Sequence, residues 1–200
     1  MKKILFFLMV TIPVLLMTQC TENKDTKNTI PLTQKKDLSA ELMILSDSVN
    51  SKWNKMMSAD SIKFTDIKRL LEEISYCKKY DEKEFERLMK FRNEVYAQRY
   101  TQNNITDSLI DKYDSSTSLL INKVRNLKSK TPEILQHPLA DQLENDIIKA
   151  DNEDLIQYRK HYDEAGLNYN NFLDQNKEEI AKDSSLQSLN KKKKLFAVNS

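Results

Sequence analysis

The chain has 200 residues, of which 39% are apolar and 31% charged, which suits one domain with an apolar core. Its single glycine, Gly166, cannot supply the tight hairpins, β-bulges and phosphate-binding loops of β-rich and nucleotide-binding folds. The 32 basic and 30 acidic residues nearly balance, which argues against a nucleic-acid-binding protein, because such proteins carry a basic excess. This composition favours an all-α fold.

The first twenty residues have the pattern of a secretion signal. Two lysines precede an apolar run over residues 4–17. A helix needs about 20 residues to cross a bilayer, so this run is too short to do so and fits the apolar region of a signal peptide. The run ends at Cys20 in a sequence that resembles a bacterial lipobox, although Gln19 stands where a small residue is usual. We therefore predict a lipoprotein signal peptide over residues 1–19 and lipidation of Cys20. The alternative is a cleaved or retained anchor in which Cys20 has no role.

Residues 20–36 are polar and lack periodicity, which predicts a flexible tether. Apolar residues then recur at steps of three and four over residues 37–182, the pattern of helices packed as in a coiled coil. The pattern blurs over residues 60–64, where we place a turn. The predicted helices are about 37–59, 65–99, 105–130 and 139–182, with Asp37 and Thr106 as cap residues and Pro132 and Pro138 as breaks.

Four amphipathic helices with short connections predict an up-and-down antiparallel four-helix bundle with long helices. Residues 183–200 form a polar, lysine-rich tail that we expect to be frayed. Its cluster Lys191–Lys194 could contact anionic lipid or another partner, and a solvated tail is the simpler interpretation. Removal of residues 1–19 would take away two lysines and leave 30 basic and 30 acidic residues.

Two blocks of sequence resemble the LemA family of envelope-associated bacterial helical proteins. In the block 53–95, Tyr80-Asp81 stands where the family has His-Glu, and Phe91-Arg92 stands where it has Ala-Arg. In the second block, 131–173, residues 131–134 are similar to the family's Tyr-Pro-Asp/Glu-Leu turn, and residues 169–172 follow its Tyr-Asn-x-Tyr pattern. The resemblance implies a membrane-anchored, all-α bundle with no established catalytic activity.

Two charged residues fall on the apolar face of the predicted second helix. Asp81 and Arg92 are eleven residues, or three turns, apart, and a lone buried charge is costly. We predict a buried polar layer that fixes helix register. Its members would be Asp81, Arg92, Tyr76, Tyr162, Tyr169 and Asn170. The alternative is that both charges reach solvent at the edge of the bundle.

No motif of a catalytic or metal site is recognisable in the sequence. Cys77 lies in an apolar stripe and is expected to be a small buried hydrophobe. His137 and His161 lack the spacing of zinc ligands, and no nucleophile elbow or phosphate-binding loop occurs. We therefore expect no enzymatic activity, no cofactor and no metal.

These observations together predict a lipidated protein of the cell envelope that faces the periplasm or the exterior. We expect membrane lipid, reached through Cys20, and an unknown envelope protein as its partners, and no nucleic acid. Its role would be that of an interaction module or scaffold. The alternative is a protein that binds a small ligand or peptide in a cleft between helices. An apolar pocket flanked by Asp81 and Arg92 would favour this second interpretation.

Overall fold

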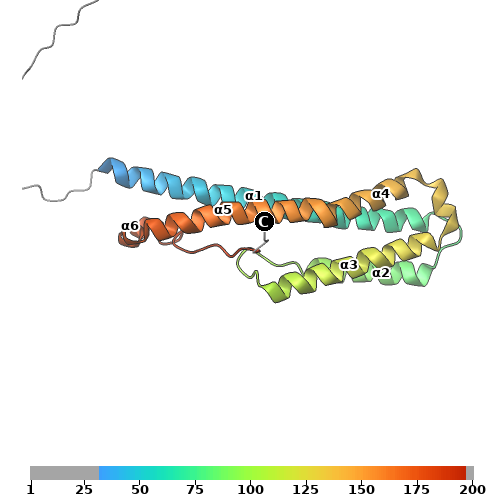
Figure 1. Ribbon diagram of the computed structural model, residues 1–200. Helices are drawn as coiled ribbons and strands as arrows, with labels where there is room; N and C mark the ends of the chain where they lie inside the picture. The colour runs from blue at the N-terminus through green and yellow to red at the C-terminus, as the bar shows by residue number, and fades with distance from the viewer. Residues whose placement is uncertain (1–31, 197–200) are drawn as a thin grey trace, which may run out of the picture.

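The computed structural model describes residues 32–196, which form an elongated all-α protein without a strand (Figure 1). Its elements are α1 (Leu32–Ser75), α2 (Glu82–Ala97), α3 (Asp107–Ser129), the 3-10 helix η1 (Pro132–Gln136), α4 (Pro138–Lys149), the π-helical segment η2 (Ala150–Asp154), α5 (Leu155–Gln175), α6 (Lys177–Lys182) and the 3-10 helix η3 (Ser184–Leu186). The all-α prediction is confirmed for these residues. The predicted signal peptide and Cys20 lie outside them.

The long helices form a rod whose two halves differ. Helix α1 packs along α4, η2 and α5, which together make an almost continuous antiparallel partner. Helices α2 and α3 form a hairpin that packs on α1 and, as Figure 1 shows, lies beside only one half of the rod. In that half, α1, α2, α3 and α4 enclose the core.

The predicted turn at residues 60–64 is wrong, because α1 runs through this region without interruption. Asp60 and Lys63 keep the steps of three and four that the flanking apolar residues follow, so they occupy core positions of the same stripe. They are only 4% and 2% exposed, respectively. The first connection falls instead at residues 76–81. The helix also begins at Leu32, so the predicted tether is wrong for its last residues.

Side-chain caps begin the next two helices. Asp81 caps α2, where its Oδ1 accepts a hydrogen bond from the Glu84 amide at 3.0 Å. Thr106 caps α3, where its Oγ1 accepts from the Leu109 amide at 3.3 Å, as the sequence predicted. Both caps satisfy amides that a helix cannot pair internally, and they therefore fix where the α2–α3 hairpin starts and turns.

The predicted fourth helix, residues 139–182, is divided into the four elements α4, η2, α5 and α6. Pro138 takes the first position of α4, where its missing amide costs nothing. The segment η2 then widens the helix locally before α5 continues to Gln175. A separate short helix, α6, follows Asn176.

The C-terminal segment folds back on the rod, so the prediction of a frayed tail is wrong for residues 183–196. Ile180 and Leu186 are buried, and Phe196 is 8% exposed. The segment packs in the half of the rod that the α2–α3 hairpin does not cover, where it contacts α1 and α5. It therefore takes the place that another helix would have.

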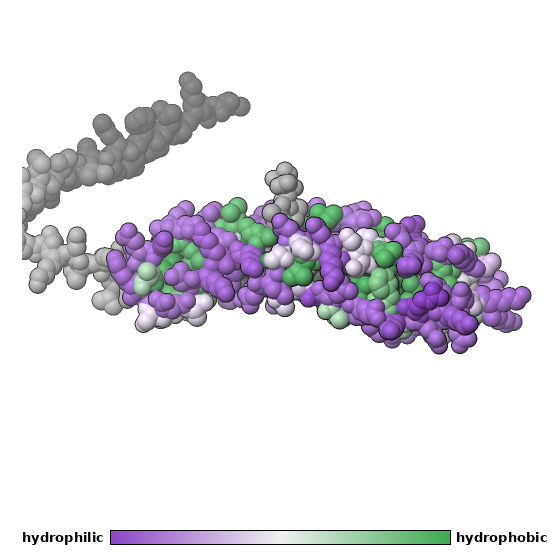
Figure 2. Space-filling view, turned by 90° about the horizontal axis from the view of Figure 1, so that it is seen from below, coloured by the Kyte–Doolittle hydropathy of each residue, from purple (hydrophilic) through white to green (hydrophobic). Residues whose placement is uncertain are grey.

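The surface of the rod is mostly hydrophilic, and apolar residues emerge in separate patches along its length (Figure 2). The most exposed large apolar side chain among the described residues is Leu135, at 79%. None of the helices within residues 32–196 combines the length and apolar character that a bilayer crossing requires.

Candidate functional site

The structure does not assemble the predicted polar layer around Asp81 and Arg92. Asp81 is exposed at the start of α2, and Tyr76 is exposed in the connection before it. The Arg92 Nε donates to the Phe64 carbonyl at 3.0 Å, and the guanidinium lies 5.7 Å from the centre of the Tyr96 ring. The prediction was wrong because it placed the chain break at residues 60–64 rather than at 76–81, and so took the cap Asp81 for a residue in mid-helix.

The other three predicted residues lie on α5 and contact the C-terminal segment. The Tyr162 hydroxyl donates to the Lys194 carbonyl at 2.9 Å, and the Tyr169 hydroxyl donates to the Leu189 carbonyl. Asn170 forms two hydrogen bonds with the main chain of Lys193. These residues are brought together, but as a contact surface for the segment rather than with Asp81 and Arg92.

A buried group of charges that the sequence did not predict lies at the middle of the rod. Lys63 Nζ is 2.8 Å from Asp151 Oδ1 and 3.2 Å from Asp60 Oδ1. Asp60 Oδ2 accepts from the Tyr113 hydroxyl at 2.7 Å and lies 3.0 Å from Arg99 Nε. We call these five residues the central charge cluster. Burial and the Asp60 charge raise the pKa of Tyr113, so the hydroxyl keeps its proton and remains a donor.

A second, half-buried ion pair continues this polar region toward α5. The Arg159 guanidinium donates to both oxygens of Asp114, at 2.7 and 2.6 Å, and to the Tyr100 hydroxyl at 2.9 Å. Burial raises the pKa of Tyr100 to about 12, although the nearby Arg159 charge acts in the opposite direction. The pair ties α5 to α3 and to the connection between α2 and α3.

The geometry of the central charge cluster favours a structural role over ligand binding. A π-helical segment, η2, carries Asp151, and such segments often mark functional sites. The adjoining cavity, however, has a volume of about 10 Å³, enough for one water molecule at most. The charges are matched to one another across α1, η2 and the connection that follows α2. The cluster therefore fixes the register of the helices, which is the role that the predicted layer was to play.

Cys77, His137 and Glu73 form a series that resembles a nucleophile, a base and an orienting acid. The Cys77 Sγ lies 3.9 Å from His137 Nε2, and His137 Nδ1 lies 3.1 Å from Glu73 Oε2. Burial, together with the charges of Glu133 and Glu73, raises the pKa of Cys77, so the thiol stays protonated. The thiol is 4% exposed, which agrees with the predicted buried hydrophobe. These contacts fasten the end of α1 to the connection between η1 and α4.

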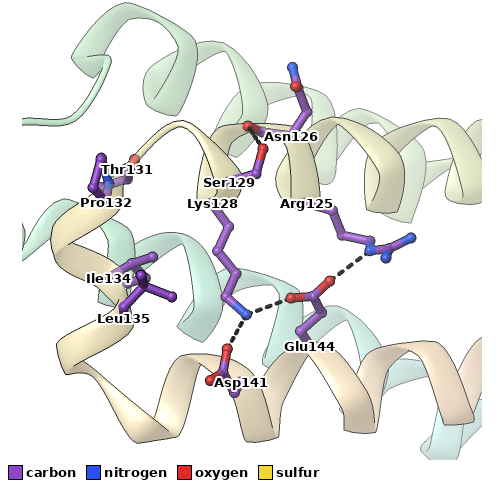
Figure 3. Close-up of a pocket in the computed structure, with 10 residues that line it drawn as sticks. All are labelled: Arg125, Asn126, Lys128, Ser129, Thr131, Pro132, Ile134, Leu135, Asp141 and Glu144. Atoms are coloured by element: carbon purple, nitrogen blue, oxygen red, sulfur yellow. Dashed lines mark hydrogen bonds and ion pairs between the residues drawn. The ribbon is translucent and has the colours of Figure 1, made fainter.

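A cleft of about 530 Å³ lies between α3, η1 and α4 (Figure 3). We call it the distal cleft. Pro132 begins η1 and Pro138 begins α4. The chain therefore passes from α3 to α4 through a short bend, which keeps the start of α4 apart from the end of α3. Its apolar lining comes from Pro132, Ile134 and Leu135, and its charged wall from Lys128, Asp141 and Glu144.

The charges of the distal cleft are paired across it. As Figure 3 shows, Lys128 reaches from α3 toward α4, where its Nζ lies 2.5 Å from both Asp141 Oδ1 and Glu144 Oε2. Arg125 Nε donates to Glu144 Oε1 at 2.7 Å. Burial works against these charges, but the hydrogen bonds from Lys128 and Arg125 outweigh it and hold the pKa of Glu144 below its ordinary value. Both cations are therefore engaged, which leaves the exposed Leu135 as the main feature for a partner to contact.

Within residues 32–196, no group of three or more histidine, cysteine or acidic side chains is arranged to hold a metal ion. Comparison with known proteins gives no further identification: no protein-family model, curated protein or solved structure matches the chain. The resemblance to the LemA family therefore stays a prediction from the sequence, and the distal cleft and the surface that holds the C-terminal segment are the candidate binding sites.

Proposed function

We propose that the protein is a lipid-anchored, extracytoplasmic interaction module of the LemA type that presents its distal cleft to another envelope protein. The observation that carries this proposal is the position of the cleft. Its lining residues come from the end of α3, η1 and the start of α4, which lie at the end of the rod opposite the start of α1 (Figure 1). We propose a binding role and assign no catalytic one.

The length of α1 sets the distance between the two ends. Its 44 residues, at about 1.5 Å each, span roughly 66 Å. The chain just beyond its C-terminal end meets η1, where the Lys78 amide donates to the Glu133 carboxylate at 2.7 Å. An anchor at Cys20, on the N-terminal side of α1, would let the rod stand off the membrane with the cleft at its far end, within reach of another envelope protein.

The chemistry of the distal cleft supports a protein partner with an apolar anchor residue. Apolar surface around Leu135 and Ile134 can bury such a side chain, and the paired charges of Lys128 and Glu144 can form the polar rim. The scaffold that we propose is an up-and-down antiparallel four-helix bundle, in which α1, α2 and α3 are three of the helices and α4, η2 and α5 together make the fourth. Its support is the packing of α1 on each of these helices.

The anchor is tested by the intact mass of the protein extracted from membranes. We expect a mature chain that begins at Cys20 and carries a diacylglyceryl group. A Cys20→Ala variant, which removes the acceptor, should appear in the soluble envelope fraction or keep its signal. A wild-type chain with an unmodified Cys20 would refute the anchor and leave the cleft proposal to stand alone.

The cleft is tested by photocrosslinking in intact cells. A photoreactive phenylalanine analogue placed at Leu135 should give one discrete adduct with another protein. A second, unlabelled copy that carries Leu135→Asp should not displace the labelled protein from its partner, and so should not reduce the yield of this adduct. The matched control is Leu167, which is 51% exposed on α5, outside the cleft. Equal adducts at both positions, or none at Leu135, would count against the cleft as an interface.

A small ligand in the distal cleft is the second candidate function, and the cleft volume favours it. About 530 Å³ falls within the range of roughly 300–1,000 Å³ that is common for ligand pockets. Neither Asp81 nor Arg92, beside which the sequence had placed such a pocket, lines the cleft. Native mass spectrometry of the extracted protein distinguishes the two functions, because a small ligand would appear as a fixed mass increment that a Leu135→Asp variant loses.

A further inference from the structure

The C-terminal segment lies in a groove between α5 and α1. Residues 189–196 run back along α5 toward the middle of the rod, and α1 forms the other wall. We call this surface the tail groove. It comprises Trp53 of α1 and Tyr162, Asp163, Gly166, Tyr169 and Asn170 of α5.

Side chains of α5 recognise the main chain of the segment rather than its side chains. The Asn170 Nδ2 donates to the Lys193 carbonyl at 2.9 Å, and its Oδ1 accepts from the Lys193 amide at 2.7 Å. The Asp163 Oδ1 accepts from the Phe196 amide at 2.7 Å. Together with the bonds of Tyr162 and Tyr169, these contacts would form with an extended peptide of almost any sequence, as in other modes of peptide recognition.

At two positions of the segment, Leu195 and Phe196, the groove contacts the side chain. A Cβ added to Gly166 would lie 2.6 Å from Leu195 Cδ2, so the only glycine of the chain makes room for this leucine. Glycine weakens a helix interior relative to alanine, and its presence in α5 therefore needs such a reason. The Phe196 ring lies 6.2 Å from the Trp53 ring and 5.6 Å from the Tyr162 ring, measured between centres.

The lysines of the segment contribute little to this fit. Lys192 pairs with Asp174 at 2.7 Å, but both side chains are more than half exposed, and such pairs are weak. Lys193 packs over the Tyr169 ring, and burial lowers its pKa, so docking acts against its charge. The groove thus fits the main chain, Leu195 and Phe196, and it tolerates the lysines.

We propose that the tail groove is a binding site for an extended peptide of a second protein that carries an apolar residue followed by phenylalanine, and that residues 189–196 are an internal occupant which this peptide replaces. The inference does not depend on the membrane anchor or on the distal cleft. A second copy of the chain carries a segment of this description, so its sequence provides the probe.

The test measures binding of a fluorescent peptide of residues 187–196, with blocked ends, to the full chain. Phe196→Ala and Leu195→Ala each weaken the internal occupant, and we expect both variants to bind the peptide at least tenfold more tightly than the wild type does. The only tryptophan of the chain, Trp53, should change its emission on binding, because the phenyl ring of the peptide stacks on it. Circular dichroism establishes that each variant keeps its helices.

Matched controls separate the groove from nonspecific binding. Adding Asn170→Ala to the Phe196→Ala variant should abolish binding, whereas Asn171→Ala, at the exposed neighbouring position, should leave it unchanged. A peptide with alanine in place of phenylalanine should bind at least tenfold more weakly. The proposal would be overturned if the folded variants do not bind the peptide at millimolar concentration, or if they bind the peptide with phenylalanine and the peptide with alanine equally.

Hydrogen exchange of the unmodified chain provides a test that needs no variant. The proposal requires the amides of Lys193 and Phe196, both hydrogen-bonded to α5, to exchange through local release of the segment. They should exchange faster than amides in the buried middle of α1. Exchange of these amides only through global unfolding would mean that the segment cannot be replaced, and would overturn the proposal independently.

Discussion

Replacing Asp60 with alanine should destabilise the fold more than any change to an exposed charge. Asp60 is the acceptor that joins three elements, since it contacts Lys63 of α1, Arg99 after α2 and Tyr113 of α3. Its loss leaves the central charge cluster with two cations and one remaining acid, Asp151. It also removes the acceptor of the buried Tyr113 hydroxyl.

The size of the effect follows from these contacts. Breaking a buried ion pair by removing one partner typically costs about 3–5 kcal/mol, because the other charge stays buried without compensation. Arg99 keeps two bonds, to Ser61 Oγ at 3.0 Å and the Met57 carbonyl at 2.7 Å, which limits the loss. For a chain of this length, each 1 kcal/mol lowers Tm by about 2–4 °C, so we expect Tm to fall by roughly 6–20 °C.

Urea unfolding followed by circular dichroism measures this free energy, with Asp47→Ala as the matched control. Asp47 is an exposed residue of the same helix, so the control should change stability by less than about 0.5 kcal/mol. A double replacement, Asp60→Leu with Lys63→Met, should cost less than Asp60→Ala alone, because both buried charges leave together. A cost below about 1 kcal/mol for Asp60→Ala would refute the claim that the cluster holds the helices in register.

Two further predictions concern the distal cleft and the tail groove. Because the pKa of Glu144 is lowered in the fold, its contribution is present above the ordinary value of 4.5 and is lost as the pH falls through the folded pKa. Stability measured by urea unfolding should therefore fall less between pH 6 and pH 3 in Glu144→Gln than in the wild type. Gly166→Ala should raise stability by about 1 kcal/mol in a Leu195→Ala background, where the added methyl group has room, and by clearly less in the wild type. Additive effects in this cycle would contradict the contact between Gly166 and Leu195.

Periodicity predicted the class of the fold but misplaced its first turn. The steps of three and four along α1 pass through Asp60 and Lys63 in register, and only the charge of these residues made the pattern look interrupted. A break would have shifted the register of the stripe, whereas charged residues at core positions leave it unchanged. That distinction could have revealed the buried cluster from the sequence. Its partners Arg99 and Asp151 come from elements distant in sequence and carried no such signal.

The candidate sites were less accessible to prediction than the fold. The distal cleft depends on the path of the chain through η1 and α4, which both begin with a proline and which keep the start of α4 apart from the end of α3. This is a matter of three-dimensional geometry. The tail groove depends on bonds between α5 side chains and main-chain atoms, which leave no pattern in the segment itself. Gly166 was the available signal, since a lone glycine inside an otherwise regular helix calls for a close neighbour.

The two halves of the rod bury the α1 stripe by different means, and this difference bears on how the tail groove can act. Where the α2–α3 hairpin ends, the rings of Trp53 and Tyr162 pack on Phe196 of the C-terminal segment, beside Tyr100 of the α2–α3 connection. The C-terminal segment covers them with Phe196, so its release without replacement would expose that apolar surface. An incoming peptide that supplies an equivalent ring removes this cost. Replacement of the segment by another peptide is therefore favoured over simple opening, and the groove should be found occupied whichever peptide it holds.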